Sequence, residues 1–243
     1  MASRTDLSIL QDFDFAIEPV GVKYFTDLPD GLPRLVEKKA LCEMIKLAQS
    51  GESFYADPER HACDAGVYVL GQSDIGEKYV NGEFGAGLGL FCDTRAASRL
   101  YNYLPHINRD VVKYVALSPL SKLTFDPDVL IMIANTTQLE IILRATSYKS
   151  GKGWVSRYSP AIGCSWLFAY PYLNGEINFI ATGLGFGMRR RKLFPEGHHI
   201  VSIPFDQLAT LIPTLKEMPW VPEPFKPDGM EFVRKLKERL DLD

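Results

Sequence analysis

Hydrophobic residues recur along this chain at two spacings, which predict strands and helices in turn. A strand is expected over residues 20–25, where β-branched and aromatic residues lie between Pro19 and an Asp-Leu-Pro-Asp-Gly turn. The apolar runs at 111–117 and 128–133 are typical of buried strands, and a shorter strand is expected at 200–203. These segments predict a sheet as the centre of the fold.

Apolar residues at helical spacing predict helices between those strands. The residues at 41, 44, 45 and 48 share one face of a helix over 38–48, which Gly51 would end. Helices are also expected over 95–104, capped by Asp93 or Thr94, and over 138–147, capped by Thr136 or Thr137. Residues 1–17 are expected to form a short helix or an ordered arm.

Two glycine-containing segments lie between the predicted helices. Residues 63–71 are expected to form a short buried helix with Cys63 near its N-terminus, and the glycine-rich segment 82–91 is expected to end as a strand. A second glycine-rich segment, 182–187, precedes another strand and another capped helix.

This order of elements suggests an internal repeat. The segment that contains Cys63 aligns with the one that contains Cys164, and Asp93 aligns with Asp206, although chance also explains so few identities. The predicted fold is a single α+β domain over residues 18–218, with halves of about 18–110 and 111–218. A mixed sheet with packed helices would relate the halves by a pseudo-twofold axis, which would allow Cys63 and Cys164 to approach each other.

The C-terminal segment has a different character. Residues 219–229 form a Pro-rich connector that should run extended, and residues 230–243 form an amphipathic helix. Such a helix folds back on its own domain or crosses to a neighbouring subunit. The second case would make the protein a homo-oligomer or an accessory subunit of a larger assembly.

Composition limits the classes of function. The chain has 243 residues and a net charge of −3, which argues against a nucleic-acid partner. No apolar run approaches the length of a membrane span, and the N-terminal residues lack the apolar core of a secretory signal. A cytoplasmic protein with a core of ordinary size is the expectation.

Four scattered cysteines, at 42, 63, 92 and 164, do not form a disulfide framework. Thiolates bind zinc and iron-sulfur clusters, so Cys42, Cys63 and Cys164 are candidate ligands, with His61 as a further ligand. The alternative is that they are small buried hydrophobic residues, because free cysteine is among the most buried residue types.

Cys63 has a second functional interpretation as a nucleophilic or redox-active thiol. A helix N-terminus lowers the pKa of a thiol, although the neighbouring Asp64 opposes that effect.

A third candidate site is the run from Gly183 to Lys192, in which glycines precede four cations. Gly185, Gly187 and Arg189 would bind a phosphate or carboxylate through backbone N–H groups and a guanidinium. Tyr55 and Trp166 flank the cysteine segments and would wall an aromatic pocket. The alternatives are a glycine-kinked strand with a solvated basic turn, and an aromatic core.

The order of several short motifs resembles domain-of-unknown-function family 169, found mainly in archaea and anaerobic bacteria. The resemblance extends from about residue 18 to 215 and rests on Pro19-Val-Gly-Val-Lys-Tyr-Phe, Cys42, Gly51-Glu-Ser-Phe-Tyr-Ala, His61-Ala-Cys63, Pro127-Asp-Val-Leu, Gln138, Cys164, Pro171-Tyr, Gly175 and Ile203-Pro-Phe.

The resemblance implies that Cys42, His61, Cys63 and Cys164 occupy positions where the family places cysteine and a His-x-Cys pair, and it strengthens the metal hypothesis. Members carry a Gly-Asp-Arg or Tyr-Gly-Ser-Arg turn where this chain has Gly185-Phe-Gly-Met-Arg189, which weakens the anion-site hypothesis. No reaction is established for the family.

The leading functional hypothesis is therefore an iron-sulfur cluster or a metal such as zinc, held by the three cysteines in a pocket between the two halves. The competing hypothesis is a metal-free module that binds an anionic or aromatic small molecule. Whether the protein is an enzyme stays open.

Overall fold

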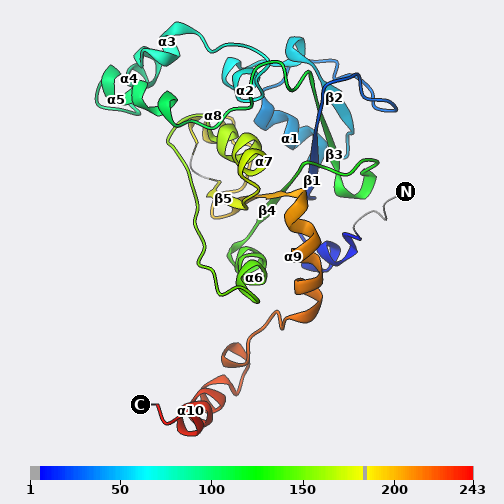
Figure 1. Cartoon of the computed structure of the whole chain (residues 1–243), viewed down its shortest axis with the longest axis vertical. Coiled ribbons are helices and arrows are strands. Elements are labelled where there is room, and N and C mark those ends of the chain that lie inside the picture. The colour runs from blue at the N-terminus through cyan, green and yellow to red at the C-terminus, as the bar shows by residue number, and fades with distance from the viewer. Residues whose placement is uncertain (1–5, 183–184, 243) are drawn as a thin grey trace.

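A six-stranded sheet forms the centre of the molecule (Figure 1). The computed structural model describes residues 6–182 and 185–242. The strands are β1 (Val20–Phe25), β2 (Phe54–Ala56), β3 (Tyr114–Pro119), β4 (Val129–Ala134), β5 (Asn178–Ala181) and β6 (His199–Pro204). They lie in the order β2-β3-β1-β4-β6-β5.

Every strand pair in this sheet is antiparallel. The prediction of a mixed sheet was therefore wrong, whereas the α+β class is confirmed. β3 and β4 are consecutive in the chain but do not pair, because β1 lies between them.

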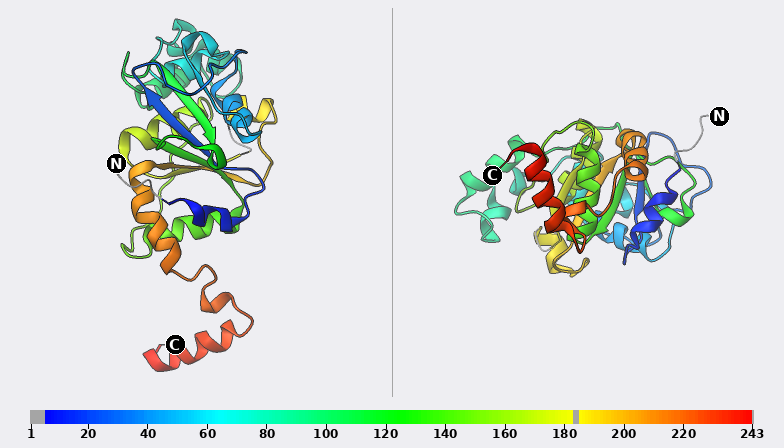
Figure 2. Two further views of the ribbon diagram at one scale, coloured as in Figure 1. Left: turned by 90° about the vertical axis from the view of Figure 1, so that its right-hand side faces the viewer. Right: turned by 90° about the horizontal axis from the view of Figure 1, so that it is seen from below.

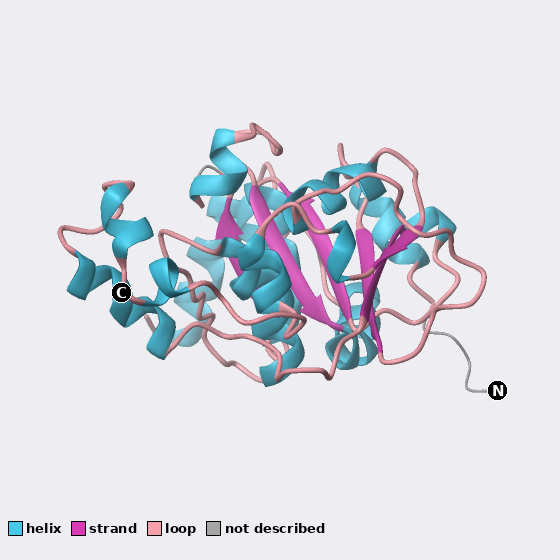
Figure 3. Cartoon of the chain, turned by 90° about the horizontal axis from the view of Figure 1, so that it is seen from above, coloured by secondary structure: helices cyan, strands magenta, loops and turns pink. Residues whose placement is uncertain are grey.

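Helices cover both faces of the sheet (Figure 3). The longer helices are α1 (Leu41–Gln49), α6 (Thr136–Ser147), α9 (Phe205–Glu217) and α10 (Gly229–Leu240). The short helices are α2 (Asp64–Val69), α3 (Glu77–Val80), α4 (Glu83–Gly87), α5 (Thr94–Ser98), α7 (Tyr170–Asn174) and α8 (Phe186–Arg190). A π-helix, η5 (Ser165–Ala169), precedes α7, and 3-10 turns lie at Ser8–Phe13 (η1), Pro58–Arg60 (η2), Arg99–Asn102 (η3), Leu120–Lys122 (η4) and Glu223–Phe225 (η6).

The alternation of side chains along β4 produces two cores. Ile131 and Ile133 face a core shared with α1 and η5, whereas Leu130 and Met132 face a core shared with α6, α9 and η1. Because all six residues of β4 are buried, the strand is an unbroken apolar run in the sequence.

The proposed twofold relation between the halves is not confirmed. The strand order is the same from either edge of the sheet when β4, β5 and β6 take the places of β1, β2 and β3. A twofold axis that exchanges the neighbouring antiparallel strands β1 and β4 must be perpendicular to the sheet. Such an axis would place the helix that follows β1 and the helix that follows β4 on the same face. Instead, α1 packs on one face and α6 on the other.

The segment from residue 72 to 104 corrects another expectation. Residues 83–87 form helix α4, not the approach to a strand, and α3, α4 and α5 project beyond the sheet at one end of the molecule (Figure 1). Gly85 permits this packing, because a Cβ there would lie 3.1 Å from the Cβ of Ala97 and 3.1 Å from the ring of Phe91. We call this part of the chain the α3–α5 segment.

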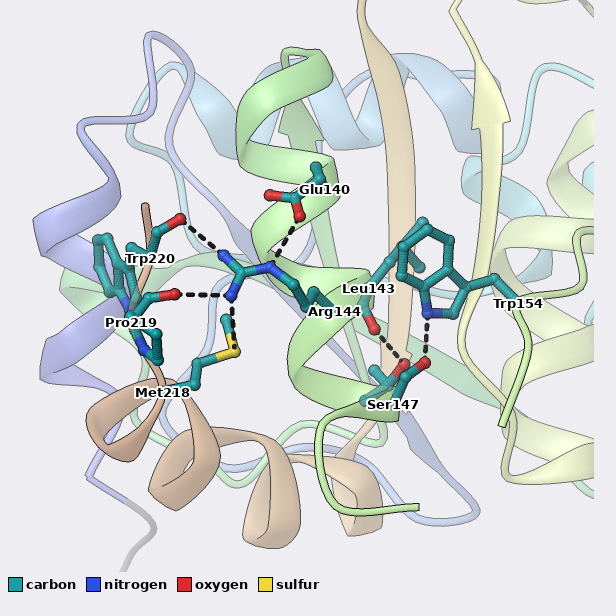
Figure 4. Close-up of polar contacts among 9 residues, drawn as sticks. Glu140, Leu143, Arg144, Ser147, Trp154, Met218, Pro219 and Trp220 are labelled. Carbon is teal, nitrogen blue, oxygen red and sulfur yellow. Dashed lines mark hydrogen bonds and ion pairs between the residues drawn. The ribbon is translucent and has the colours of Figure 1, made fainter. Parts of the chain in front are cut away.

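At the opposite end, the chain leaves the sheet through a clamped connector (Figures 1 and 2). Arg144 on α6 donates hydrogen bonds to the carbonyl oxygens of Pro219 and Trp220, each at 2.6 Å, and to Glu140 at 2.7 Å (Figure 4). Beyond Trp220, η6 and α10 extend away from the body as an arm of residues 221–242 (Figure 2). Within residues 6–182 and 185–242, no helix is long and apolar enough to cross a membrane.

Candidate ligand pocket

A cavity of about 570 Å³ lies between the α3–α5 segment and the first residues of α1 and α2. Residues 161–164, ahead of η5, and residues 185–188, 190 and 191 of the α8 region complete its walls. The cavity therefore has walls from five separate parts of the chain. Glu43 joins two of these walls: it accepts a hydrogen bond from the amide of Ala40 at the start of α1, and it pairs with Arg191 at 3.3 Å.

Three cysteines line this cavity, and each lies at the start of a helix. Cys42 is the second residue of α1, Cys63 directly precedes α2, and Cys164 directly precedes η5. Gly66 lets α2 approach α1, because a Cβ at Gly66 would lie 3.2 Å from the Cβ of Leu41. α2 also packs against η5, so the three helix starts are neighbours.

The helix that follows Cys164 has an unusual geometry. Pro171 has no N–H group and cannot supply the α-helical hydrogen bond to the carbonyl of Leu167, and the turn from Ser165 to Ala169 is a π-helix. π-Helical turns are rare and occur frequently at functional sites.

Burial determines the protonation of two of the thiols. It raises the pKa of Cys42 to about 11, against the opposing effect of Arg191, and it raises the pKa of Cys164 well above its ordinary value. Cys63 interacts electrostatically with both. At neutral pH, Cys42 and Cys164 are therefore protonated.

The described residues contain no group of three or more His, Cys, Asp or Glu side chains arranged to hold a metal ion. The three thiols share a cavity wall without the close convergence of a preformed metal centre. A metal bound there would have to draw the thiols together and displace protons from Cys42 and Cys164.

His61 lies behind the cavity wall and does not line it. Its side chain is 7% exposed, and neither ring nitrogen has a hydrogen-bond partner. Its Nδ1 atom would lie 3.7 Å from a Cβ at Gly66, on the inner side of α2. Burial lowers the pKa of His61 to about 4, which leaves the ring neutral at physiological pH.

The α8 region supplies the cationic side of the cavity. Arg190 and Arg191 line it together with Gly185 and Gly187, whereas Arg189 does not. Arg191 is held by Glu43, but no ion pair or hydrogen bond engages the side chain of Arg190 within the described residues. Gly183 and Leu184, at the start of the predicted glycine run, lie outside the described residues.

Arg189 was the predicted anion ligand in a run of four cations, whereas its neighbours Arg190 and Arg191 are the two that line the cavity. The run of cations in the sequence correctly indicated a positively charged segment. Which of the cations face the cavity depends on the rotation of the short helix α8, which sequence spacing alone does not determine.

The α3–α5 segment supplies the apolar and aromatic wall, which the sequence analysis did not anticipate. Phe84, Phe91 and Leu100 line the cavity beside the phenols of Tyr79 and Tyr101. Burial raises the pKa of both phenols, that of Tyr101 to about 12, and Asp64 on the opposite wall adds to the shift of Tyr79.

Tyr55 and Trp166 lie outside the cavity lining. The ring of Tyr55 packs edge-on against Tyr114 on the neighbouring strand, with ring centroids 5.7 Å apart. Trp166 is buried, and its indole N–H donates to the hydroxyl of Ser159 at 2.7 Å. Both aromatic side chains thus serve the packing of the sheet and of η5.

A comparison with protein families assigns the chain. The model of DUF169, described as an uncharacterised ArCR family, matches residues 9–213. The chain belongs to the DUF169 family. The match includes every residue that lines the cavity, so the pocket lies within the family domain, and the arm of residues 221–242 lies outside it.

The chain is also similar to a curated protein, the uncharacterised protein MJ0308 of Methanocaldococcus jannaschii. It is 27% identical to this chain over 135 residues, which are 55% of this chain and 58% of the relative. The match thus spans little more than half of either protein. No solved structure matches the chain.

Proposed function

We propose that this DUF169 protein binds a small amphipathic anion, one that carries an aromatic or apolar group beside a carboxylate, sulfonate or phosphate. The observation that carries the proposal is Arg190, a cation without an ion pair within the described residues that lines an otherwise largely apolar cavity. A guanidinium presents a planar set of donors that matches such anions.

The size and lining of the cavity support this ligand class. A volume of about 570 Å³ falls within the range of roughly 300–1,000 Å³ that is usual for small-molecule sites. Phe84, Phe91 and Leu100 would bury the apolar part of the ligand, and the α8 wall would hold its anionic group. Asp64 would disfavour a second anionic group on the α2 side.

Anilinonaphthalene sulfonate, an aromatic sulfonate that fluoresces in apolar surroundings, is a suitable probe. Arg190→Gln should raise its Kd about tenfold, the value of one charge-assisted hydrogen bond. Arg189→Gln is the matched control, because it removes an adjacent cation that does not line the cavity. Equal effects of the two substitutions in a fluorescence titration would refute the proposal.

The second candidate is the metal or iron-sulfur site, and the presence of Cys42, Cys63 and Cys164 on one cavity favours it. His61 would act as a fourth ligand only after movement of α2, which separates it from the cavity. Metal analysis of anaerobically purified protein tests this function. Stoichiometric iron or zinc that is lost in Cys63→Ser and retained in Cys92→Ser would establish it, and the absence of both metals would remove it.

A further inference from the structure

The three cavity thiols differ in their accessibility. Cys63 and Cys164 are partly exposed on the cavity wall, whereas Cys42 is only 8% exposed. A ligand in the cavity would therefore meet Cys63 or Cys164 before Cys42, and Cys42 lies behind Cys63 on the adjoining helix start. This order, one accessible thiol followed by one shielded thiol, suits a pair that exchanges with a disulfide.

The helix starts that carry Cys63 and Cys42 lie against each other. α2 approaches α1 at Gly66, where a Cβ would lie 3.2 Å from the Cβ of Leu41, the neighbour of Cys42. All three thiols interact electrostatically with one another. Glu43 holds Arg191, which lines the same cavity as Cys42.

We propose that the cavity carries out thiol–disulfide exchange with a small aromatic disulfide that bears carboxylates, with Cys63 as the attacking thiol and Cys42 as the resolving thiol. The proposal rests on the ligand pocket proposed above and names the reactive group of its ligand. The apolar wall and Arg190 would hold the ring and carboxylate while the disulfide meets Cys63.

The two steps balance in atoms and electrons. Cys63 loses its proton to solvent, and its thiolate attacks one sulfur of the disulfide, which forms a mixed disulfide as the first half of the substrate leaves as a thiolate. Cys42 then attacks the sulfur of Cys63, and its proton passes to the second leaving thiolate. The substrate accepts two electrons and becomes two thiols, and the protein gains one disulfide.

The test uses dithiobis(nitrobenzoate), an aromatic disulfide with a carboxylate on each ring, at one equivalent per chain. The protein is the full chain with Cys92→Ser, which removes the exposed thiol outside the cavity. We expect two equivalents of nitrothiobenzoate to be released, and the intact mass to fall by two hydrogens with no adduct. Release of one equivalent, with a stable adduct on the protein, would overturn the proposal.

Two further variants assign the roles. Cys42→Ser should stop the reaction at the adduct on Cys63, and Cys63→Ser should abolish the rapid release while circular dichroism confirms that the variants are folded. An adduct retained by Cys164→Ser but not by Cys42→Ser would overturn the assignment of Cys42. Because anilinonaphthalene sulfonate contains no disulfide, its binding to Cys63→Ser separates a failure of exchange from a failure of the pocket.

Discussion

His61 shows at the scale of one residue how burial alone can set the acid stability of this fold. The neutral ring is sealed beneath α2 with neither nitrogen paired. Its folded pKa of about 4 lies below the ordinary value of 6.5, so between these values the unfolded chain binds a proton that the folded chain does not. The contribution of the neutral His61 to the free energy of unfolding is therefore fully present above pH 6.5 and is lost as the pH falls toward 4.

The first prediction follows from that shift. Between pH 7.5 and 4.5, titration of His61 should lower the free energy of unfolding of the native chain by roughly 2 to 3 kcal/mol, and His61→Phe should remove that part of the loss. Urea unfolding at the two pH values measures it. His198→Phe, which replaces a histidine that is only half-buried and lies between β5 and β6, is the control. If His61→Phe and the native chain lost equal stability, His61 would have to be charged in the folded protein.

Residue-scale features differed in how far the sequence could predict them. Cysteine is rare and chemically distinct, so Cys42, Cys63 and Cys164 could be chosen as candidates, and all three line the cavity. The seclusion of His61 depends on Gly66 and the approach of α2 to α1, a long-range contact that spacing from Cys63 does not reveal.

At the scale of elements, a set of polar contacts joins α6 to the chain after α9 (Figure 4). The guanidinium of Arg144 is largely buried and satisfies two carbonyl groups at the point where the arm begins. Trp220, at this point, packs against Phe13 with ring centroids 4.4 Å apart.

The second prediction is that Arg144→Met destabilises the body by about 2 to 3 kcal/mol, because the carbonyls of Pro219 and Trp220 lose a charged donor. Arg234→Met, which removes an exposed arginine paired on α10, should change stability far less, because solvent screens that pair. Urea unfolding followed by tryptophan fluorescence compares them. Equal effects would show that the contact at Arg144 does not hold the connector.

Strands were predicted more successfully than the elements that build the pocket. β4 carries the clearest signal, since a central strand buried on both faces is apolar throughout, and β1 and β3 are marked by their β-branched and aromatic residues. The α3–α5 segment consists of helices of four or five residues, too short for helical periodicity to appear. Gly85 in this segment allows α4 to pack closely against Ala97 and Phe91, whereas the glycine-rich sequence was expected to lead into a strand.

At the scale of the whole molecule, the arm raises the question of assembly. Met230, Phe232 and Leu240 of α10 are exposed. Apart from sparse contacts, α10 packs only against the neighbouring η6 within the described part of the chain. The C-terminal helix was predicted either to fold back on its own domain or to cross to another subunit, and the crossing stays a prediction.

The third prediction is that the full chain self-associates through α10. Deletion of residues 222–243 keeps Trp220 and its bond to Arg144, and it should reduce the mass measured by light scattering to that of one chain. Leu236→Glu, placed on the apolar face, should act like the deletion, whereas Lys235→Glu should not. A full-length chain of monomer mass at every concentration would contradict the prediction.

The central claim is that the helix starts at Cys42, Cys63 and Cys164 and the α3–α5 segment enclose one ligand site. Alkylation of the folded chain by iodoacetamide, read at each cysteine by mass spectrometry, tests it with an internal control. With anilinonaphthalene sulfonate at ten times its Kd, labelling of Cys63 should slow roughly tenfold while labelling of the exposed Cys92 is unchanged. Unchanged labelling of Cys63 under saturating probe would place the ligand elsewhere and contradict the account.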